Sequence, residues 1–279
     1  MKSNSSPNDI PFKFLKIASC IVSEWLSEFF NKCMTTGEFP DSWKITHITP
    51  IPKVHSPSSS SEYRPISVLP VLPKLFEKVL YHRVYSYLTE HDLIDKRQYG
   101  FRENHSTELA ITAIYDEPLR NLDNKLITCS LFLDLSKAFD CCDHEILLDK
   151  LYHDGIRGVS HKVLSNFLHN RMQCTKIGAF KSSYKRISCG VPQSSVISPL
   201  LFLIYINDIT KASSFDTTLF ADDIKLPYKA IKIVNPTNTG SLEEHFQHLN
   251  ILCLPKLYTI SAGLWSRSRK DFQPEESES

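Results

Sequence analysis

The sequence predicts an α+β fold in which an antiparallel sheet is backed by helices. Segments with apolar residues at helical spacing alternate with short apolar runs of strand length. Two of the strand-like runs, over 126–135 and 217–229, carry carboxylates. Hydrophobic residues make up 42% of the chain and charged residues 23%, which is the composition of a chain that buries a core. The 279 residues suffice for one large domain or two small ones.

The first half of the chain predicts three helices and one strand. Residues 44–53 alternate like a strand but contain prolines, so we expect an edge strand. Helices are expected over 73–90, where Pro73 lies near the start, and over 105–120. The first helix is expected over 12–34, with its apolar face made by Leu15, Ala18, Val22, Trp25, Leu26 and Phe29.

The second half predicts a strand over 126–135 and then a helix over 143–153. Asp143 is the expected N-cap of that helix, and Gly155 and Gly158 are expected to end it. The later elements are a helix over 160–170, a hairpin over 172–189, a buried helix over 199–209, and a strand, turn and return strand over 217–229. The pattern weakens after residue 230, and 264–279 has the composition of a disordered tail.

Local charge is uneven although the net charge is only +1. Residues 101–150 carry five Lys/Arg and ten Asp/Glu, whereas residues 151–190 carry seven Lys/Arg and one Asp. An acidic segment followed by a basic one suits a metal site beside a track for a phosphate backbone. A solvated surface with uneven charge is the alternative.

Cysteine usage and the absence of long apolar runs favour an intracellular protein. The chain has eight cysteines but no CxxC pair and no apolar signal core near its N-terminus, so we expect reduced thiols. Cys141 and Cys142 lie near His144, but no second ligand pair has zinc spacing. The longest apolar run, 200–206, falls far short of the ~20 residues that cross a bilayer.

Two apolar runs carry the carboxylates that point to chemistry. Asp222 and Asp223 lie between Phe220-Ala221 and Ile224, and Asp134 ends the run that begins at Leu131. Burying an unpaired carboxylate is costly, and a divalent cation is the usual compensation. Two metal ions roughly 4 Å apart, held by carboxylates, catalyse phosphoryl transfer in polymerases. A hairpin tip is the alternative for an Asp-Asp pair taken alone.

Several further blocks occur together with these aspartates, in one order along the chain. With them, the chain resembles the reverse transcriptase domain of non-LTR (LINE-type, jockey/CR1-like) retrotransposons, from about residue 10 to about residue 229. The blocks are Phe39–Lys44, Tyr63–Ser67, Gln98–Arg102, Phe132–Asp140, Gly190–Gln193 and Phe220–Asp223.

The resemblance implies a polymerase palm over 126–229, preceded by a fingers-like region over 12–125 that combines helices and strands. Residues 1–11 would be a flexible N-terminus. Residues 230–279 would be a divergent, partly disordered tail, so that the thumb is missing and the domain is truncated. Partners implied are an RNA template, a DNA primer and deoxynucleoside triphosphates, with no membrane. The family's mode of action places such a protein in the nucleus.

The resemblance also assigns roles to individual residues. Asp134 and Asp222 would bind two Mg²⁺ ions, with Asp223 assisting. Phe139 would lie under the incoming sugar and exclude a 2′-hydroxyl; a core aromatic is its other interpretation. Gln193 would lie near the template–nascent base pair, or be an ordinary loop glutamine.

Two cations of the fingers-like region complete the implied site. Lys53 and Arg64 would reach the triphosphate, where a guanidinium suits phosphate oxygens, or be surface charges.

The chain departs from the family pattern at two serines. Ser194 and Ser198 stand where the family usually has glycine, which permits positive φ and close backbone approach. Two functions therefore follow from the sequence: an RNA-directed DNA polymerase, or a catalytically inactive remnant that at most binds nucleic acid.

Overall fold

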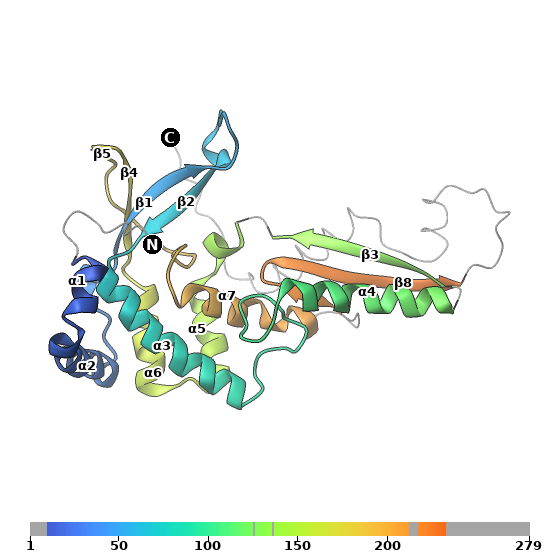
Figure 1. Ribbon diagram of the computed structural model, residues 1–279, viewed down its shortest axis with the longest axis horizontal. Coiled ribbons are helices and arrows are strands. Elements are labelled where there is room, and N and C mark those ends of the chain that lie inside the picture. The colour runs from blue at the N-terminus through green and yellow to red at the C-terminus, as the bar shows by residue number, and fades with distance from the viewer. Residues whose placement is uncertain (1–9, 125, 136, 212–216, 233–279) are drawn as a thin grey trace, which may run out of the picture. The chain divides into compact units, whose positions relative to one another are not determined.

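The computed structural model describes residues 10–124, 126–135, 137–211 and 217–232. Met1–Ile231 forms one compact unit, and Lys232–Ser279 forms a second of which only Lys232 is described. The first unit contains helices and two sheets (Figure 1), so the expected α+β class is confirmed. None of the helices in the described ranges combines the length and apolarity that a membrane crossing requires. The tail expected over 264–279 lies outside the described residues.

The N-terminal helical region consists of two helices rather than the single one expected. α1 (Phe12–Ile17) and α2 (Ser19–Thr36) are separated at Ala18. α2 ends at Gly37, whose φ of 71° is the left-handed conformation that glycine adopts without a steric cost.

The buried face of α2 also differs from the expectation. Phe30 and Cys33 are buried, whereas Trp25 is 72% exposed and Phe29 42% exposed. The adjacent pair Phe29-Phe30 allows two overlapping apolar stripes. The stripe that contains Phe30 is the buried one, because its ring packs against Phe76 as well as Trp43, whereas Phe29 packs against Trp43 and stays 42% exposed.

One sheet is mixed, whereas the antiparallel arrangement was expected of the sheet that carries the aspartates. It contains β1 (Ile45–Pro52), β2 (Tyr63–Val68), β4 (Met172–Ile177), β5 (Phe180–Lys181) and β6 (Lys185–Arg186). Its order is β2-β1-β4-β5, and β6 pairs with β4. β1 pairs antiparallel with β2 but parallel with β4, which a long intervening crossover permits.

β1 is therefore not the edge strand that its prolines predicted. Its first four residues, Ile45–Ile48, pair with β4, while Pro50 and Pro52 lie beyond that ladder and pair only with β2. A proline that lacks a donor is tolerated where no second strand needs one. The prolines thus lie in a part of β1 that has one neighbour.

The core is formed by helices packed around α7 (Ser198–Ile206), the buried helix that the sequence predicted. α7 packs against α5 (His144–His153), and residues of α3 (Val71–Glu90) and α6 (Gly158–Leu168) belong to the same core. Burying one large apolar side chain stabilises the fold by about 1.5–3 kcal/mol. Fully buried members include Phe76, Leu147, Leu151, Phe167 and Leu201.

The helix caps were predicted in part. The Asp143 carboxylate accepts hydrogen bonds from the backbone N–H groups of Glu145 and Ile146, at 2.9 and 3.1 Å, so the expected N-cap is confirmed. Gly155 follows α5 with a φ of 92°. Gly158 instead begins α6, so its expected role as a helix terminator is wrong.

The second sheet carries the aspartates. β3 (Leu126–Asp134), β8 (Asp223–Lys232) and β7 (Thr218–Phe220) lie in the order β3-β8-β7. β7 and β8 form an antiparallel hairpin, which confirms the predicted strand, turn and return strand. α4 (Thr107–Asp123) runs along this sheet (Figure 1), and the Lys225 ammonium on β8 donates to the Ile114 carbonyl at 3.0 Å.

Short 3₁₀ turns connect these elements. They are η1 (Asp41–Trp43), η2 (Ser60–Glu62), η3 (Ala138–Cys141) and η4 (Asn207–Lys211). η3 follows β3, and η4 continues α7 and precedes β7. Both turns are therefore close in sequence to the strands that carry the aspartates. The boundary expected between a fingers-like region and a palm at residues 125 and 126 stays a prediction.

Candidate active site

The three aspartates of interest come from adjacent strand ends. Asp222 lies in the turn of the β7–β8 hairpin, and Asp223 begins β8. Asp134 ends β3, the neighbour of β8. The Leu135 N–H donates to the Asp222 carbonyl at 3.4 Å, which fixes the end of β3 beside the turn. The fold therefore brings together the carboxylates that are 88 residues apart in sequence, from Asp134 to Asp222.

These carboxylates repel one another. Partial burial raises the pKa of Asp223, and the negative charges of Asp222 and Asp134 raise it further. Carboxylate oxygens are the ligands that Mg²⁺ prefers, so the chemistry of this donor set fits that ion. Within the described ranges, however, no group of three or more His, Cys, Asp or Glu side chains has the arrangement of a metal centre.

A buried glutamine holds the hairpin turn in place. The Gln98 side chain is 2% exposed, and its Oε1 accepts hydrogen bonds from the N–H groups of Gly100 and Ala221, at 2.8 and 2.9 Å. Ala221 has a φ of 56°, a conformation that is uncommon for any residue with a Cβ. The Gln98 amide thus stabilises a strained turn directly beside Asp222.

Backbone contacts extend this support. The Tyr99 N–H donates to the Leu219 carbonyl at 2.8 Å, and the Leu219 N–H donates to the Arg97 carbonyl at 2.9 Å. Gly100 packs so closely that an added Cβ would lie 2.2 Å from the Ala221 nitrogen. The segment from Arg97 to Gly100 therefore holds the turn in its conformation, a role that was not predicted from the sequence.

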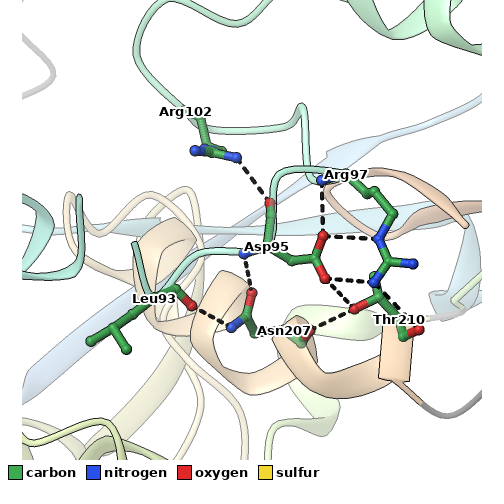
Figure 2. Close-up of polar contacts among 6 residues, drawn as sticks. All are labelled: Leu93, Asp95, Arg97, Arg102, Asn207 and Thr210. Carbon is green, nitrogen blue, oxygen red and sulfur yellow. Dashed lines mark hydrogen bonds and ion pairs between the residues drawn. The ribbon is translucent and has the colours of Figure 1, made fainter. Parts of the chain in front are cut away.

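A polar network fastens the same segment to the helical core (Figure 2). The Arg97 guanidinium donates twice to the Asp95 carboxylate, at 3.0 and 2.8 Å, and the Thr210 hydroxyl donates to it as well. These bonds hold the pKa of Asp95 well below its usual range, Arg97 having the largest effect. The Asn207 side chain accepts from the Asp95 N–H, and Arg102 donates to the Asp95 carbonyl, both at 2.9 Å.

Phe139 lies in η3 and packs on the core. Its ring stacks on Phe202 with centroids 4.7 Å apart and meets Phe101 edge-on at 6.0 Å. The Phe139 carbonyl accepts from the Val191 N–H at 2.8 Å. These contacts fit the interpretation of Phe139 as a core aromatic, and its role under an incoming sugar stays a prediction.

The Gly190–Gln193 block lies against η3, the 3₁₀ turn that contains Phe139 and Asp140. The Gln193 amide donates to the Asp140 carboxylate at 3.0 Å, and the Gly190 N–H donates to the Cys142 carbonyl at 2.7 Å. Gly190 has a φ of 85°, and an added Cβ would lie 2.7 Å from the Asp140 carbonyl oxygen. Glycine is therefore required here by both conformation and space.

The two serines that replace glycines have different surroundings. Ser194 is exposed and has a φ of 80°, a conformation that glycine adopts far more readily than serine. Ser198 is buried, and its hydroxyl oxygen lacks a hydrogen-bond partner within the described structure.

The loop between these serines is held by a buried carboxylate on α3. Glu77 accepts from the Ser195 hydroxyl and the Val196 N–H, both at 2.7 Å. Burial raises the pKa of Glu77, which these two hydrogen bonds and the charge of Arg171 oppose. Glu77 was not among the residues that the sequence singled out.

Lys53 and Arg64 belong to a different part of the unit. Arg64 lies on β2, and Lys53 directly follows β1, where its N–H donates to the Glu62 carbonyl. Both therefore belong to the hairpin of the mixed sheet and not to the sheet that bears the aspartates. Their contact with a triphosphate stays a prediction.

Comparison with known proteins identifies the family. Residues 51–253 match the family described as Reverse transcriptase (RNA-dependent DNA polymerase). This match extends beyond residue 229, where the resemblance was expected to end. The RNA-directed DNA polymerase from mobile element jockey of Drosophila melanogaster is 31% identical over 80% of this chain and 25% of its own length. The probable RNA-directed DNA polymerase from transposon BS of the same species is 30% identical over 82% and 26%.

Among solved structures, telomerase from Candida albicans in complex with a fragment of telomeric RNA aligns with a TM-score of 0.49 and 13% identity, over 81% of this chain and 44% of that one. The chain spans about a quarter of the length of these two curated relatives. The family match covers well over half of the chain. This chain therefore belongs to the reverse transcriptase family and is related to the reverse transcriptases of jockey-type non-LTR retrotransposons.

Proposed function

We propose that this chain is an RNA-directed DNA polymerase domain of a non-LTR retrotransposon, with the β7–β8 hairpin as the metal-bearing edge of a polymerase palm. The observation that carries the proposal is the meeting of Asp134, Asp222 and Asp223 at adjacent strand ends. In the proposed reaction, the 3′-hydroxyl of a primer attacks a deoxynucleoside triphosphate and releases pyrophosphate. Two divalent cations would stabilise the attacking and leaving oxygens.

Asp134 and Asp222 are the proposed Mg²⁺ ligands, and Asp223 assists. The support is the carboxylate chemistry of the three side chains and the mutual repulsion that raises the pKa of Asp223. A cation that binds the folded state and not the unfolded one raises Tm. We expect Mg²⁺ to raise the Tm of the wild type and to leave the Tm of an Asp134→Asn/Asp222→Asn variant unchanged.

The remaining residues are proposed to position the substrates. Phe139 would contact the sugar, Gln193 the template–nascent base pair, and Lys53 and Arg64 the triphosphate. The segments of Phe139 and Gln193 are joined by hydrogen bonds, from the Val191 N–H to the Phe139 carbonyl and from the Gln193 amide to the Asp140 carboxylate. The two side chains therefore lie on connected segments directly after β3. The proposed partners are an RNA template, a DNA primer and deoxynucleoside triphosphates.

Primer extension on an RNA template tests the activity. Wild type should extend the primer only when Mg²⁺ is present, and Asp222→Asn, which keeps the side-chain volume, should not. The Tm of both proteins without metal shows whether the variant is folded. Equal extension by both would refute the assignment of Asp222, and no extension by a folded wild type would refute the activity of this chain.

An inactive remnant is the second candidate, and two observations favour it. Ser194 holds a glycine-type conformation, and Ser198 buries a hydroxyl oxygen that has no partner among the described atoms. If these serines impair catalysis, a Ser194→Gly/Ser198→Gly variant should extend primers at least tenfold faster than wild type. Salt-dependent binding to primer–template with no extension by either protein would support the remnant.

A further inference from the structure

A patch of exposed apolar side chains lies on α1 and α2. Ile17, Ile21 and Trp25 are 75%, 76% and 72% exposed, Phe14 is 61% exposed and Phe29 is 42% exposed. We call these five residues the apolar patch. Single exposed apolar side chains are normal on a protein surface, whereas a contiguous group of them marks an interaction site.

Helical spacing aligns the α2 part of the apolar patch. Ile21, Trp25 and Phe29 are four residues apart, so their side chains lie one above another on the same side of α2. They form a ridge of large apolar side chains along the helix.

The α1 part continues this ridge across the joint between the two helices. The Ala18 N–H donates to the Phe14 carbonyl, and the Ile21 N–H donates to the Ala18 carbonyl, both at 2.9 Å. Helical hydrogen bonds are therefore made on both sides of Ala18, and Ile17 lies about one turn before Ile21. The side chains of the apolar patch consequently follow one another along α1 and α2.

α2 uses a different side to join the core. Phe30 and Cys33 are buried, Leu26 and Met34 pack against the same core, and α2 contacts α6 (Figure 1). The most exposed residues of the apolar patch are therefore not needed to hold α2 in place, and they can be replaced without opening the core.

The size of the apolar patch fits one side of a stable interface. Full exposure of a large side chain is about 150–250 Å², so the exposed fractions of the five residues amount to roughly 500–800 Å² of mostly apolar surface. The largest patch on an ordinary monomer covers about 300–600 Å². A standard interface buries about 800 Å² of each partner, polar rim included. Two such patches face to face therefore supply the area that a stable dimer needs.

The charges around the apolar patch select among partners. Residues of both signs are exposed on the same two helices, namely Lys13, Lys16, Glu24, Glu28 and Lys32. A strongly basic partner would meet the lysines, a strongly acidic partner or an anionic membrane surface would meet the glutamates, and like charges oppose binding. A second copy of the chain carries the same mixture, so charges of either sign can face their opposites.

We infer that the apolar patch binds a second copy of this chain in a two-fold symmetric dimer. Side chains four residues apart form the ridges that interdigitate in the commonest class of helix packing. A two-fold dimer uses the same surface twice, and an axis near Trp25 brings Ile21 of each copy against Phe29 of the other. The association needs neither metal nor nucleic acid, and the apolar patch lies outside residues 51–253, which match the reverse transcriptase family.

Sedimentation equilibrium from about 1 to 100 µM protein tests the inference, because interfaces of standard size have dissociation constants from micromolar downwards. Wild type should approach twice the monomer mass. Ile21→Glu/Trp25→Glu should sediment as a monomer, with a dimer affinity at least about 100-fold weaker, since two central anchors are lost.

The matched control is Ile111→Glu/Tyr115→Glu. It changes two exposed apolar residues at the same spacing on α4, and it should remain a dimer. Far-ultraviolet circular dichroism shows that each variant is folded.

The fluorescence of Trp25 reports contact at the apolar patch itself. Its indole is largely exposed in the monomer and is buried in the inferred dimer, so dilution of wild type should shift the emission to longer wavelength. Trp25→Phe keeps an aromatic ring and should still dimerise, while its two remaining tryptophans show no such shift.

Wild type that remains monomeric over the whole concentration range would overturn the inference. Equal loss of the dimer in the α2 variant and the α4 control would do the same, as would a dimer that dissociates without a change in Trp25 emission. A monomeric wild type that binds phosphatidylcholine vesicles through Trp25 would assign the apolar patch to a lipid surface instead. None of these results depends on primer extension, so the proposed activity can fail while the dimer stands.

Discussion

Replacing Gln98 by leucine removes the acceptor that holds the aspartate turn. The substitution nearly conserves volume, but it leaves the N–H groups of Gly100 and Ala221 buried without their partner. Each orphaned buried donor costs about 1–3 kcal/mol, so Gln98→Leu should lower the free energy of unfolding by about 2–6 kcal/mol. A domain near the middle of the ordinary range of stability, about 10 kcal/mol, remains folded after such a loss.

Urea unfolding and hydrogen exchange together measure this effect. The unfolding midpoint should fall, and the amides of Gly100 and Ala221 should lose protection more than those of α5 and α7, because the turn opens locally. If the hairpin carries the catalytic carboxylates, primer extension should fall in kcat more than in KM, since the substrates bind over a wider surface than the turn.

Gln173→Leu is the matched control, because Gln173 is half-buried on β4 and lies in the other sheet. It should change the free energy of unfolding by no more than about 0.5 kcal/mol. Equal unfolding midpoints for Gln98→Leu, Gln173→Leu and wild type would show that the Gln98 amide does not support the turn.

Three further predictions concern the same region. Asp223→Asn should raise the free energy of unfolding at neutral pH by a fraction of a kcal/mol, seen as a slightly higher Tm, while it lowers primer extension; the effect is small because the side chain is largely exposed. Because the folded-state pKa of Asp223 is raised, the wild type should gain stability as the pH falls through that pKa, and the gain should be smaller in the variant. Ser194→Gly should stabilise the fold by about 0.5–1 kcal/mol, measured by urea unfolding. The left-handed conformation costs a serine roughly 1–2 kcal/mol, and the greater chain entropy that glycine loses on folding offsets part of the gain. Gly100→Ala should shift the unfolding midpoint further than Gly178→Ala, because its Cβ would meet the Ala221 backbone, whereas an alanine at Gly178 has open space and only the strain of a φ of 59°; equal shifts would refute the close approach.

Local signals in the sequence predicted the elements that local interactions decide. The Asp143 cap needs only the two N–H groups that follow it. The pairing of β7 with β8 is likewise indicated by two short apolar runs with a turn between them. A cap and a hairpin pairing are specified within a few residues, so a single sequence suffices to predict them, whereas the conformation of the turn depends on the distant Gln98.

Features that depend on distant segments were missed. The pairing of Ile45 with Met172 makes β1 an interior strand, and no periodicity within β1 indicates a partner so far along the chain. Glutamine usually lies at the surface, so nothing in the Gln98 block indicated that its amide is buried against Ala221. The buried Glu77 is a similar case, since a glutamate on an amphipathic helix is expected to face water.

The contact between Gln98 and Ala221 also has a kinetic consequence. The two residues are 123 positions apart, so the turn receives its support only after a large loop has closed. Contacts of such sequence separation form late, because the entropy of loop closure is lost before the contact compensates for it. During synthesis, the Arg97–Gly100 segment leaves the ribosome well before its partner. The aspartate turn should therefore be among the last parts of this unit to reach its native conformation.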